Sequence, residues 1–596
     1  MSTPHATSWA WIVAAFVVGP WTTNASAQTC HMARASIDDS GFEGDAGSGL
    51  TSISSDGRYV AFHSAAGNLV ANDTNLRDDV FVRDLWTGVT ERVSEPTGGG
   101  EGDGSSGYAS ISGDGRFVVF TSWSTNLVPN DTNNTNDVFV RDRATGTTER
   151  LSLPAPGSGA EADYSSFIGN VTTNGRFVTF LSYATNLVPG DTNLARDVFL
   201  VDRAAGTIER VSIGHLGQEA DDNSGGNGVS AFVSEDGRYV AFTSSASNLV
   251  PGDTNFLPDA FVRDRVLGTT RRVSVGLGGA EPDDACDAAG ISADGRVVGI
   301  TSAATNLVAG DTNQGIDCFL ATLATGSIER VSLSSAGTEG SLSSWGMSLS
   351  GDGRFAVFVS MSPDLVTGDF NNRRDVFVRD VPAHTTTLAS VSDFGAQGDE
   401  DCFGASISAD GSCVAFASLS LAFVPFDNNS VSDAFVRECR TATLFCPGDA
   451  TNCPCGNGGS GRTGCANSAT AGALLDVQGS ASVSNDTVTL VASGLPDGAP
   501  VLFLQSTQTL GGGSGTTVGD GLRCVGSPVT FLGLRYAFGG RASFGFVGSD
   551  PLVSVVGGVP SGGDLRRYQA WYRDTAPFCA PQSFNFTNGA EMLWMP

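Results

Sequence analysis

The chain has 596 residues, a hydrophobic fraction of 40% and a formal net charge of −30, and it contains no lysine, so every basic side chain except histidine is arginine. This length and composition belong to a globular protein with one large repetitive core or several cores, not to a disordered tail. An acidic surface repels phosphate backbones and anionic lipids, which argues against nucleic-acid and membrane-surface partners. Multivalent cations are the partners that it attracts.

The N-terminus has the pattern of a secretory signal. The apolar run "WAWIVAAFVVG" (residues 9–19) is too short to span a bilayer, and "ASA" (residues 25–27) is a small-x-small cleavage site. We predict a signal peptide over residues 1–27 with cleavage after Ala27, although its first residues carry His5 and no Lys or Arg; a buried first strand is the alternative. The mature protein would be secreted, periplasmic or on the cell surface, without membrane insertion, and its cysteines would form disulfides.

A turn dipeptide recurs seven times along the next 400 residues. It consists of Asp or Asn followed by Gly, and successive copies are 58, 60, 62, 58, 58 and 58 residues apart. Repeats of this length are typical of solenoids and β-propellers. The copies begin at Asp56, Asp114, Asn174, Asp236, Asp294, Asp352 and Asp410.

Each repeat contains four short β signals and no helical period. In the second repeat these are residues 109–112, 116–122, 137–143 and 148–153, with the Asp-Gly turn between the first two. Asp-Gly suits a type I′ hairpin, and the apolar runs suit sheets covered on both faces. Four antiparallel strands repeated radially form a β-propeller blade, so we predict an all-β fold.

The two ends of the repeat region complement each other. The seventh repeat stops after its third strand (residues 433–439), and "MARASI" (residues 32–37) matches the missing fourth strand. We therefore predict a seven-bladed propeller over residues 28–445, closed by the N-terminal strand; six blades with a decayed extra unit is the alternative. This closure places Cys30 beside Cys439, so we predict a disulfide between them, or between Cys30 and nearby Cys446.

The composition changes after residue 445. Residues 446–470 are rich in Gly, Asn and Cys and are predicted to be a linker, and strand-like runs follow at 486–494, 500–506, 567–574 and 591–596. Alternating patterns with turn signals predict a small β-sandwich domain over residues 471–596. The spacing of Cys446, Cys453, Cys455 and Cys465 is poor for zinc, which favours disulfides here.

The repeats resemble a known family. "ISADGR" (residues 291–296), "SEDGRYVAFTS" (234–244) and "DVFVRD" (375–380) look like the TolB-like, WD-repeat-like propeller repeats of exported bacterial proteins, over about residues 32–440. The resemblance implies the fold and says little about activity, because propellers host binding, scaffolding and catalysis alike. TolB also has an N-terminal α/β domain that this chain lacks, so its partners are not carried over. The C-terminal domain resembles the Cys-rich tails of exported bacterial proteins.

The sequence offers few catalytic groups. There is no Gly-x-Ser-x-Gly motif and no HExxH motif, and His31, His63, His215 and His384 fall at unrelated repeat positions. The acidic residues recur in every blade, whereas a catalytic pair is normally unique. We therefore predict a non-catalytic binding or scaffold protein with an unknown protein or glycan ligand. A carbohydrate-active enzyme with paired carboxylates near the central channel and a surface adhesin are the alternatives, and the oligomeric state is left open.

The strongest candidate site is an Asp-x-Asn-x-x-x-Asp loop between the second and third strands of each blade. Hard oxygen ligands at short spacing suit Ca²⁺, although Asx turns alone would explain the first Asp and the Asn. A Glu-x-Asp pair recurs in the connection between blades, which emerges on the same face: Glu43/Asp45, Glu101/Asp103, Glu161/Asp163, Glu219/Asp221 and Glu281/Asp283. The predicted ligand sets are Asp73, Asn75 and Asp79; Asp131, Asn133 and Asp137; Asp191, Asn193 and Asp197; Asp253, Asn255 and Asp259; Asp311, Asn313 and Asp317; Asp369, Asn371 and Asp375; and Asp427, Asn429 and Asp433.

A second set of charges follows the Asp-Gly turns. The arginines after the turn could form a ring that binds anions, or they could pair with the Arg-Asp segments of the neighbouring strand. Exposed pairs of this kind are common and weak, so we favour the structural interpretation. The residues are Arg58, Arg116, Arg176, Arg238, Arg296 and Arg354, with Ser412 in the seventh repeat.

Overall fold

The structure is a computed structural model. It describes residues 29–594 except for 86, 155–159, 227–230, 426, 441–442, 447, 449–452, 455–457, 460–462, 471, 479–482, 484–485, 487, 546–549, 561–563 and 575–583. The predicted signal peptide, residues 1–27, lies outside the described residues.

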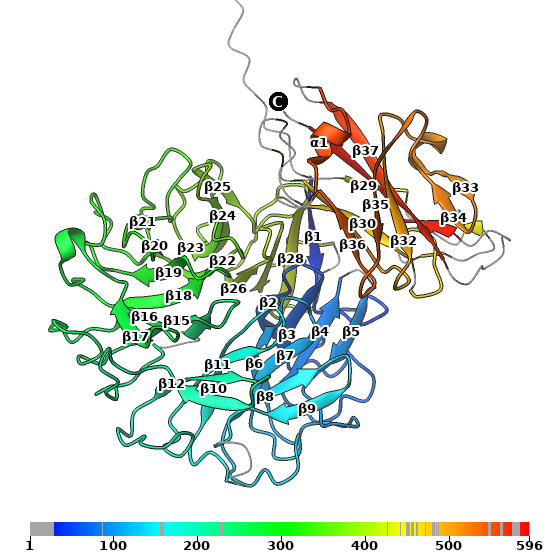
Figure 1. The fold of residues 1–596 in the computed structure, drawn as a ribbon. Coiled ribbons are helices and arrows are strands. Elements are labelled where there is room, and N and C mark those ends of the chain that lie inside the picture. The colour runs from blue at the N-terminus through cyan, green and yellow to red at the C-terminus, as the bar shows by residue number, and fades with distance from the viewer. Residues whose placement is uncertain are drawn as a thin grey trace, which may run out of the picture.

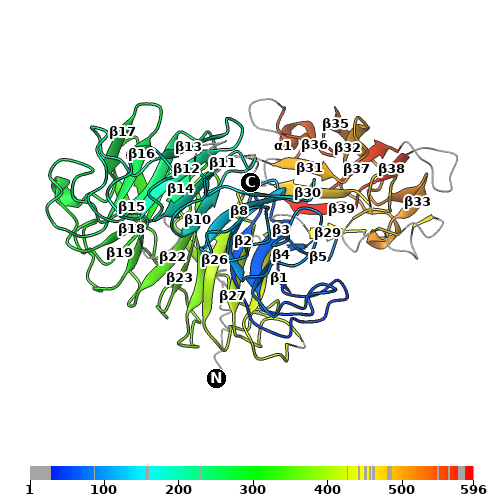
Figure 2. The same ribbon diagram turned by 90° about the horizontal axis from the view of Figure 1, so that it is seen from below.

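Seven four-stranded antiparallel sheets are arranged in a ring, which confirms the predicted seven-bladed propeller and not the six-bladed alternative (Figures 1 and 2). Blades one to three are β2–β5 (Ser48–Ile53, Tyr59–Ser64, Asp79–Asp84, Val89–Arg92), β6–β9 (Ser106–Ile111, Phe117–Ser122, Asp137–Asp142, Thr147–Arg150) and β10–β13 (Ser166–Val171, Phe177–Ser182, Asp197–Asp202, Thr207–Arg210). Blades four to six are β14–β17 (Ala231–Val233, Tyr239–Ser244, Asp259–Asp264, Thr269–Arg272), β18–β21 (Cys286–Ile291, Val297–Ser302, Asp317–Thr322, Ile328–Arg330) and β22–β25 (Ser344–Leu349, Phe355–Ser360, Asp375–Asp380, Thr385–Leu388).

Blade two shows why these residues form these strands. Gly115 takes a φ of 71° at the turn between β6 and β7, a conformation that favours glycine. The two central strands, β7 and β8, are buried along almost their whole length, as their apolar runs predicted. The rings of Phe120 and Phe139 stack 5.9 Å apart across these strands, and Phe120 packs with Val82 of the preceding blade. The core therefore lies between the blades.

The ring is closed by strands from the two ends of the repeat region. Blade seven contains β26 (Cys402–Ile407), β27 (Cys413–Ser418), β28 (Asp433–Arg440) and, as its fourth strand, β1 (Thr29–Arg34). Cys30 is opposite Cys439 in the β1–β28 register, and the two form a disulfide. The predicted closure and its predicted disulfide are both confirmed.

The C-terminal domain consists of two packed sheets. The larger has the order β29-β39-β37-β32-β35 with β38 beside β37: Thr443–Phe445, Gly589–Leu593, Leu565–Arg573, Pro500–Ser506, Val529–Tyr536 and Phe584–Phe586. The smaller has the order β30-β31-β36: Leu474–Gln478, Thr489–Ser493 and Ala542–Phe544. Leu475 and Leu490 of the small sheet share a core with Phe503 and Tyr568 of the large sheet, as in the predicted sandwich.

The remaining elements of this domain are small. They are the hairpin β33–β34 (Thr516–Val518 and Gly521–Arg523), the short helix α1 (Val553–Val556) and a 3₁₀ turn at Gly511–Gly513; the propeller has a similar turn at Leu277–Gly279. The strand β29 already belongs to the C-terminal sheet, so this domain takes in residues before the predicted boundary at 446. An ion pair of 3.2 Å between Arg541 and Asp56 joins the domain to blade one.

Six of the described cysteines form disulfides across the two domains, whereas Cys286, Cys318, Cys402 and Cys413 of the propeller are buried thiols, so the prediction of disulfides is wrong for these four. Besides Cys30–Cys439, the structure has Cys446–Cys524 and Cys453–Cys465, so the prediction of disulfides in this segment is confirmed for these residues. Cys455 lies outside the described residues. Three disulfides indicate an extracellular or periplasmic protein. None of the helices in the described part of the chain has the length and apolarity that a membrane crossing requires.

The closing disulfide leads to a prediction about stability. Cys439→Ser should lower the free energy of unfolding by about 3–5 kcal/mol, because the lost bond closes a long loop, with a sequence separation of 409 residues. Urea denaturation measures the change, with Cys453→Ser as a control that opens a separation of only 12 residues. A loss at Cys439 no larger than that of the control would contradict closure by this bond.

Candidate functional site

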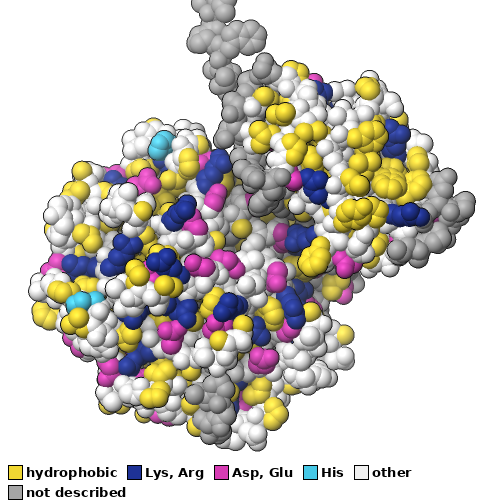
Figure 3. Space-filling model, in the orientation of Figure 1, with side chains coloured by type: hydrophobic (Ala, Val, Ile, Leu, Met, Phe, Trp, Pro, Cys, Tyr) yellow, Lys and Arg dark blue, Asp and Glu magenta, His cyan; other side chains and the backbone are white. Residues whose placement is uncertain are grey.

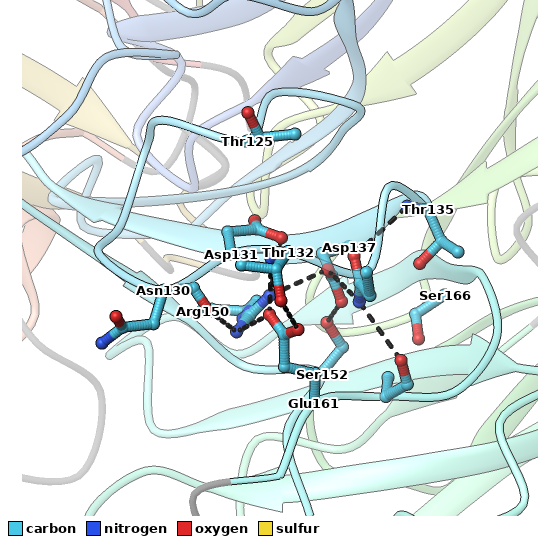
Figure 4. Close-up of polar contacts among 12 residues, drawn as sticks. Thr125, Asn130, Asp131, Thr132, Thr135, Asp137, Arg150, Ser152, Glu161 and Ser166 are labelled. Atoms are coloured by element: carbon cyan, nitrogen blue, oxygen red, sulfur yellow. Dashed lines mark hydrogen bonds and ion pairs between the residues drawn. The ribbon is translucent and has the colours of Figure 1, made fainter.

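The acidic loop of blade two is built by hydrogen bonds within the loop (Figure 4). Asn133 accepts a hydrogen bond from the backbone N–H of Thr135, which is an Asx turn, and donates to Asp137 over 2.9 Å. Asp137 begins β8 and is fully buried, and its other carboxylate oxygen accepts a 2.5 Å bond from Ser152. The predicted turn chemistry is therefore present.

A guanidinium group occupies the centre of these carboxylates. Arg150 ends β9, the outermost strand of the blade, and its Nη1 lies 2.9 Å from Asp131 and 3.2 Å from Asp137. Its Nη2 is 2.9 Å from Glu161, which belongs to the connection to the next blade. The side chains of Arg150 and Asp131 are only 6% and 3% exposed, so this is a nearly buried ion-pair network. We call the arginine, the two aspartates and the glutamate the latch.

The Glu-x-Asp pair ties two blades together. Glu161 accepts hydrogen bonds from the backbone N–H and the hydroxyl of Thr132 in blade two, at 2.9 and 2.6 Å. Asp163, two residues later, accepts the equivalent bonds from Thr185 in blade three, at 2.8 and 2.7 Å. One connection therefore holds the loops of the blade that it leaves and of the blade that it enters, which explains the recurrence of both acidic residues.

The latch is present in six of the seven blades. Blade seven uses Arg34 of the N-terminal strand, which pairs with Glu43, Asp427 and Asp433, so the closing strand also supplies a latch. The remaining latches are Arg92 with Asp73, Asp79 and Glu101; Arg210 with Asp191, Asp197 and Glu219; Arg272 with Asp253, Asp259 and Glu281; and Arg330 with Asp311, Asp317 and Glu339.

Burial sets the electrostatics of the latch. Burial raises the pKa of Asp131 to about 6, and the Arg150 guanidinium limits that rise. Burial by itself would raise the pKa of Glu161 as well. Hydrogen bonds from Thr132 and Arg150 have the larger effect, so the pKa of this carboxyl is lowered. Losing the arginine would therefore leave buried acidic groups without a countercharge.

The latch bears directly on the predicted calcium ligands. Among the described residues, one group of three ligating side chains lies within 4.8 Å: Asp311, Asp317 and Glu339 of blade five. Nη1 of Arg330 is 3.3, 3.2 and 2.7 Å from these same carboxylates, so the guanidinium stands where an ion would stand. In the six blades with a latch, internal ion pairs account for the acidic residues without calcium.

Blade six is the exception. Leu388 occupies the strand position of the arginine, opposite Phe377, just as Arg330 lies opposite Phe319 in blade five. Gln397 replaces the glutamate and donates a 3.2 Å hydrogen bond to Asp369. Asp369 and Asp375 of the original motif remain, 6% and 0% exposed. The sequence predictions treated all seven loops alike and missed this difference.

The opposite ends of strands β7 and β8 carry a second set of ion pairs. Arg116, after the Asp-Gly turn, makes two parallel hydrogen bonds to Asp142, at 2.9 and 2.7 Å. Its guanidinium and that of Arg203 in the next blade cover the ring of Phe117, 4.8 and 4.5 Å from the centroid. The same pairing occurs at Arg58, Arg176, Arg238 and Arg354. In blade five, Thr322 takes the place of the strand aspartate, opposite Val297, and Arg296 is 80% exposed and, among the described residues, has an ion pair to Asp294 only. The structural interpretation of these arginines is confirmed for five of the six.

The innermost strands of all seven blades line a central channel that contains a cavity of about 350 Å³. Its lining is neutral: hydroxyl and amide groups, as in Ser110 and Asn170, alternate with apolar groups such as Phe232. Among the described residues, no acidic side chain lines this cavity, so the carboxylates expected there by the enzyme alternative are not among its lining side chains. Tyr108 lines the channel with 54% of its surface exposed and a φ of 49°, which is unusual for a bulky residue.

Charge on the molecular surface agrees with this arrangement. Over the propeller face in Figure 3, arginine and acidic side chains lie beside one another and do not separate into patches of one sign. On this face the acidic side chains therefore lie next to arginines.

Comparison with known proteins finds only distant similarity. No protein family and no curated protein matches the sequence. Similar solved structures include "Oligogalacturonate lyase in complex with manganese" (13% identity, TM-score 0.42, covering 69% of this chain and 98% of that chain). They also include the β-propeller domain of the Trilobed protease from Pyrococcus furiosus (10% identity, TM-score 0.42, covering 66% of this chain and 93% of that chain). A third is TolB from Acinetobacter baumannii (15% identity, TM-score 0.31, covering 61% of this chain and 76% of that chain). At this distance they carry no argument about function, and none bears on the predicted resemblance of the C-terminal domain.

The latch predicts a large effect of one substitution. Arg150→Leu should lower the free energy of unfolding by about 3–5 kcal/mol, because it leaves three mostly buried carboxyl groups without their cation. Chemical denaturation provides the measurement, and the exposed Arg296→Leu is the matched control. A loss below about 1 kcal/mol would show that the network contributes little.

The ion pairs at the Asp-Gly turns predict a small, pH-dependent effect. Hydrogen bonds from Arg116 lower the pKa of Asp142 to about 2, so this pair stabilises the fold above the ordinary Asp pKa and loses its contribution as the pH falls from about 4 to 2. Because Arg116 is 46% exposed, Arg116→Ala should cost about 1 kcal/mol or less at pH 7.

Urea titrations at pH 7 and pH 2 test this, with Arg296→Ala as a control, because Thr322 replaces the strand aspartate in blade five and the ion pair of Arg296, with Asp294 at 3.4 Å, is exposed. The cost of Arg116→Ala should shrink at pH 2. An equal cost at both pH values would assign the effect to packing on Phe117.

Proposed function

We propose that this chain is a secreted, non-catalytic propeller that binds an uncharged polar ligand at its central channel, with TolB-like repeats as the scaffold. The neutral lining of the channel carries the proposal. Catalysis by acid and base most often uses carboxyl or imidazole groups; among the described residues the channel lining has neither, and the carboxyl groups of the latches are paired with arginine. Hydroxyl, amide and aromatic groups together suit sugar rings or neutral peptide segments.

The position of Tyr108 supports the same proposal. It lies at a bulge between the pairs Gly107–Thr121 and Ser110–Val119, which turns its side chain out of the regular alternation of the strand. Leu50 of blade one lies at an equivalent bulge with a φ of 41°. Bulky residues in this backbone conformation cost free energy and concentrate at binding sites. A glycan is our preferred ligand, and a protein segment is the second candidate.

A glycan array followed by calorimetry tests this proposal. Tyr108→Ala should weaken binding of any glycan found by about tenfold, the loss expected for about 1.4 kcal/mol of ring contact. Tyr164→Ala is the control, because this tyrosine is similarly exposed (60%) and does not line the cavity. Binding that is unaffected by Tyr108→Ala would place the site elsewhere. Turnover of a glycan by the purified protein would support the carbohydrate-active enzyme instead.

A further inference from the structure

Blade six keeps the two aspartates of the latch and lacks its cation. No ion pair of Asp369 or Asp375 occurs within the part of the chain that the structure describes. Asp375 is fully buried; its Oδ1 accepts a 2.5 Å hydrogen bond from Ser390, whereas its Oδ2 has no hydrogen-bond partner. The matching oxygen of Asp317 in blade five accepts hydrogen bonds from Asn313 and Arg330, at 3.0 and 3.2 Å. A buried carboxylate oxygen without a donor is rare in proteins.

Other oxygen atoms in blade six face the place of the missing guanidinium. In blade five, Arg330 also donates to the backbone carbonyl of Gly310, over 3.1 Å, and Gly368 is the equivalent residue before Asp369. The glutamate oxygen that accepts the backbone N–H of Thr312 is the same one that meets Arg330. In blade six, Oε1 of Gln397 accepts the corresponding N–H of Phe370, over 3.1 Å. This amide oxygen therefore has the position that the arginine-binding oxygen has in blade five.

We propose that blade six binds one divalent cation of the Ca²⁺ class in place of the arginine. Its ligands are the carboxylates of Asp369 and Asp375, the side-chain oxygen of Gln397 and the backbone carbonyl of Gly368. Carboxylates, an amide oxygen and a carbonyl are the hard ligands that Ca²⁺ takes, and Leu388 carries no guanidinium to compete with the ion. Water would complete the coordination, because four protein ligands are fewer than Ca²⁺ requires.

The alternative is that blade six needs no cation. Gln397 donates to Asp369, and a proton shared by the carboxyl groups could replace the ion. The two states differ in a measurable way, because only a metal site takes up calcium from solution. The proposal is also independent of the channel ligand: a protein that binds no glycan can still bind calcium here, and the reverse is equally possible.

Calorimetric titration of the chelator-treated full chain with CaCl₂ tests the proposal. We expect one ion per chain, with a dissociation constant in the range of about 10⁻⁴–10⁻³ M that is common for extracellular modules. At free calcium ten times this constant, the equilibrium constant for unfolding should fall about 11-fold. Asp375→Asn should abolish the binding, and Asp317→Asn in blade five should leave it unchanged.

A double variant gives the most specific control. Leu388→Arg with Gln397→Glu rebuilds the latch of the other blades, so it should fold with at least the stability of the metal-free protein and bind no calcium. No uptake of calcium by the natural chain would overturn the proposal. So would uptake of one ion by a folded double variant, or by folded Asp375→Asn if the double variant does not fold, because the ion would then bind elsewhere.

Discussion

The propeller depends on an arginine that ends the outermost strand in six of its seven blades and meets carboxyl groups from two segments of the chain. Arg150 contacts the loop of its own blade through Asp131 and the connection to the next blade through Glu161. Apolar packing between blades supplies most of the cohesion, but it does not fix how neighbouring blades are aligned at the rim. Directional ion pairs and hydrogen bonds fix this alignment. Each member of such a buried network is costly to remove, because its partners are then left buried and unpaired.

The same interaction explains the acidic composition. The motif brings three carboxyl groups together for each arginine, so repeating it accumulates negative charge while each cluster stays partly neutralised from within. Blade seven has the same ion-pair network, because the N-terminal strand β1 completes this blade and supplies Arg34. The closing disulfide between Cys30 and Cys439 lies on the same strand pair. A covalent bond and an ion-pair network thus secure the one junction that chain connectivity does not.

Much of the fold was predictable because the repeat is regular. The spacing of the Asp-Gly turns gave the blade count, and the absence of a fourth strand after residue 439 gave the closure and the disulfide. The partner of the acidic loop was harder to identify, because Arg150 lies 13 residues beyond Asp137 in a segment that was interpreted only as a strand. A signal was present: arginine recurs at this position until Leu388, and the glutamate changes to Gln397 in the same blade. The strand-to-loop geometry that joins these positions comes only from the structure.

The central claim is that arginine, not calcium, neutralises the acidic loops in six blades, and that blade six alone takes a cation. Anomalous diffraction from crystals grown in millimolar calcium tests this most directly, because it locates every bound ion. The account predicts one peak in the latch region, between Asp369 and Asp375, and guanidinium density in the other six blades. Calcium peaks at several of the six arginine positions, or clear density for a metal-free blade six, would contradict it.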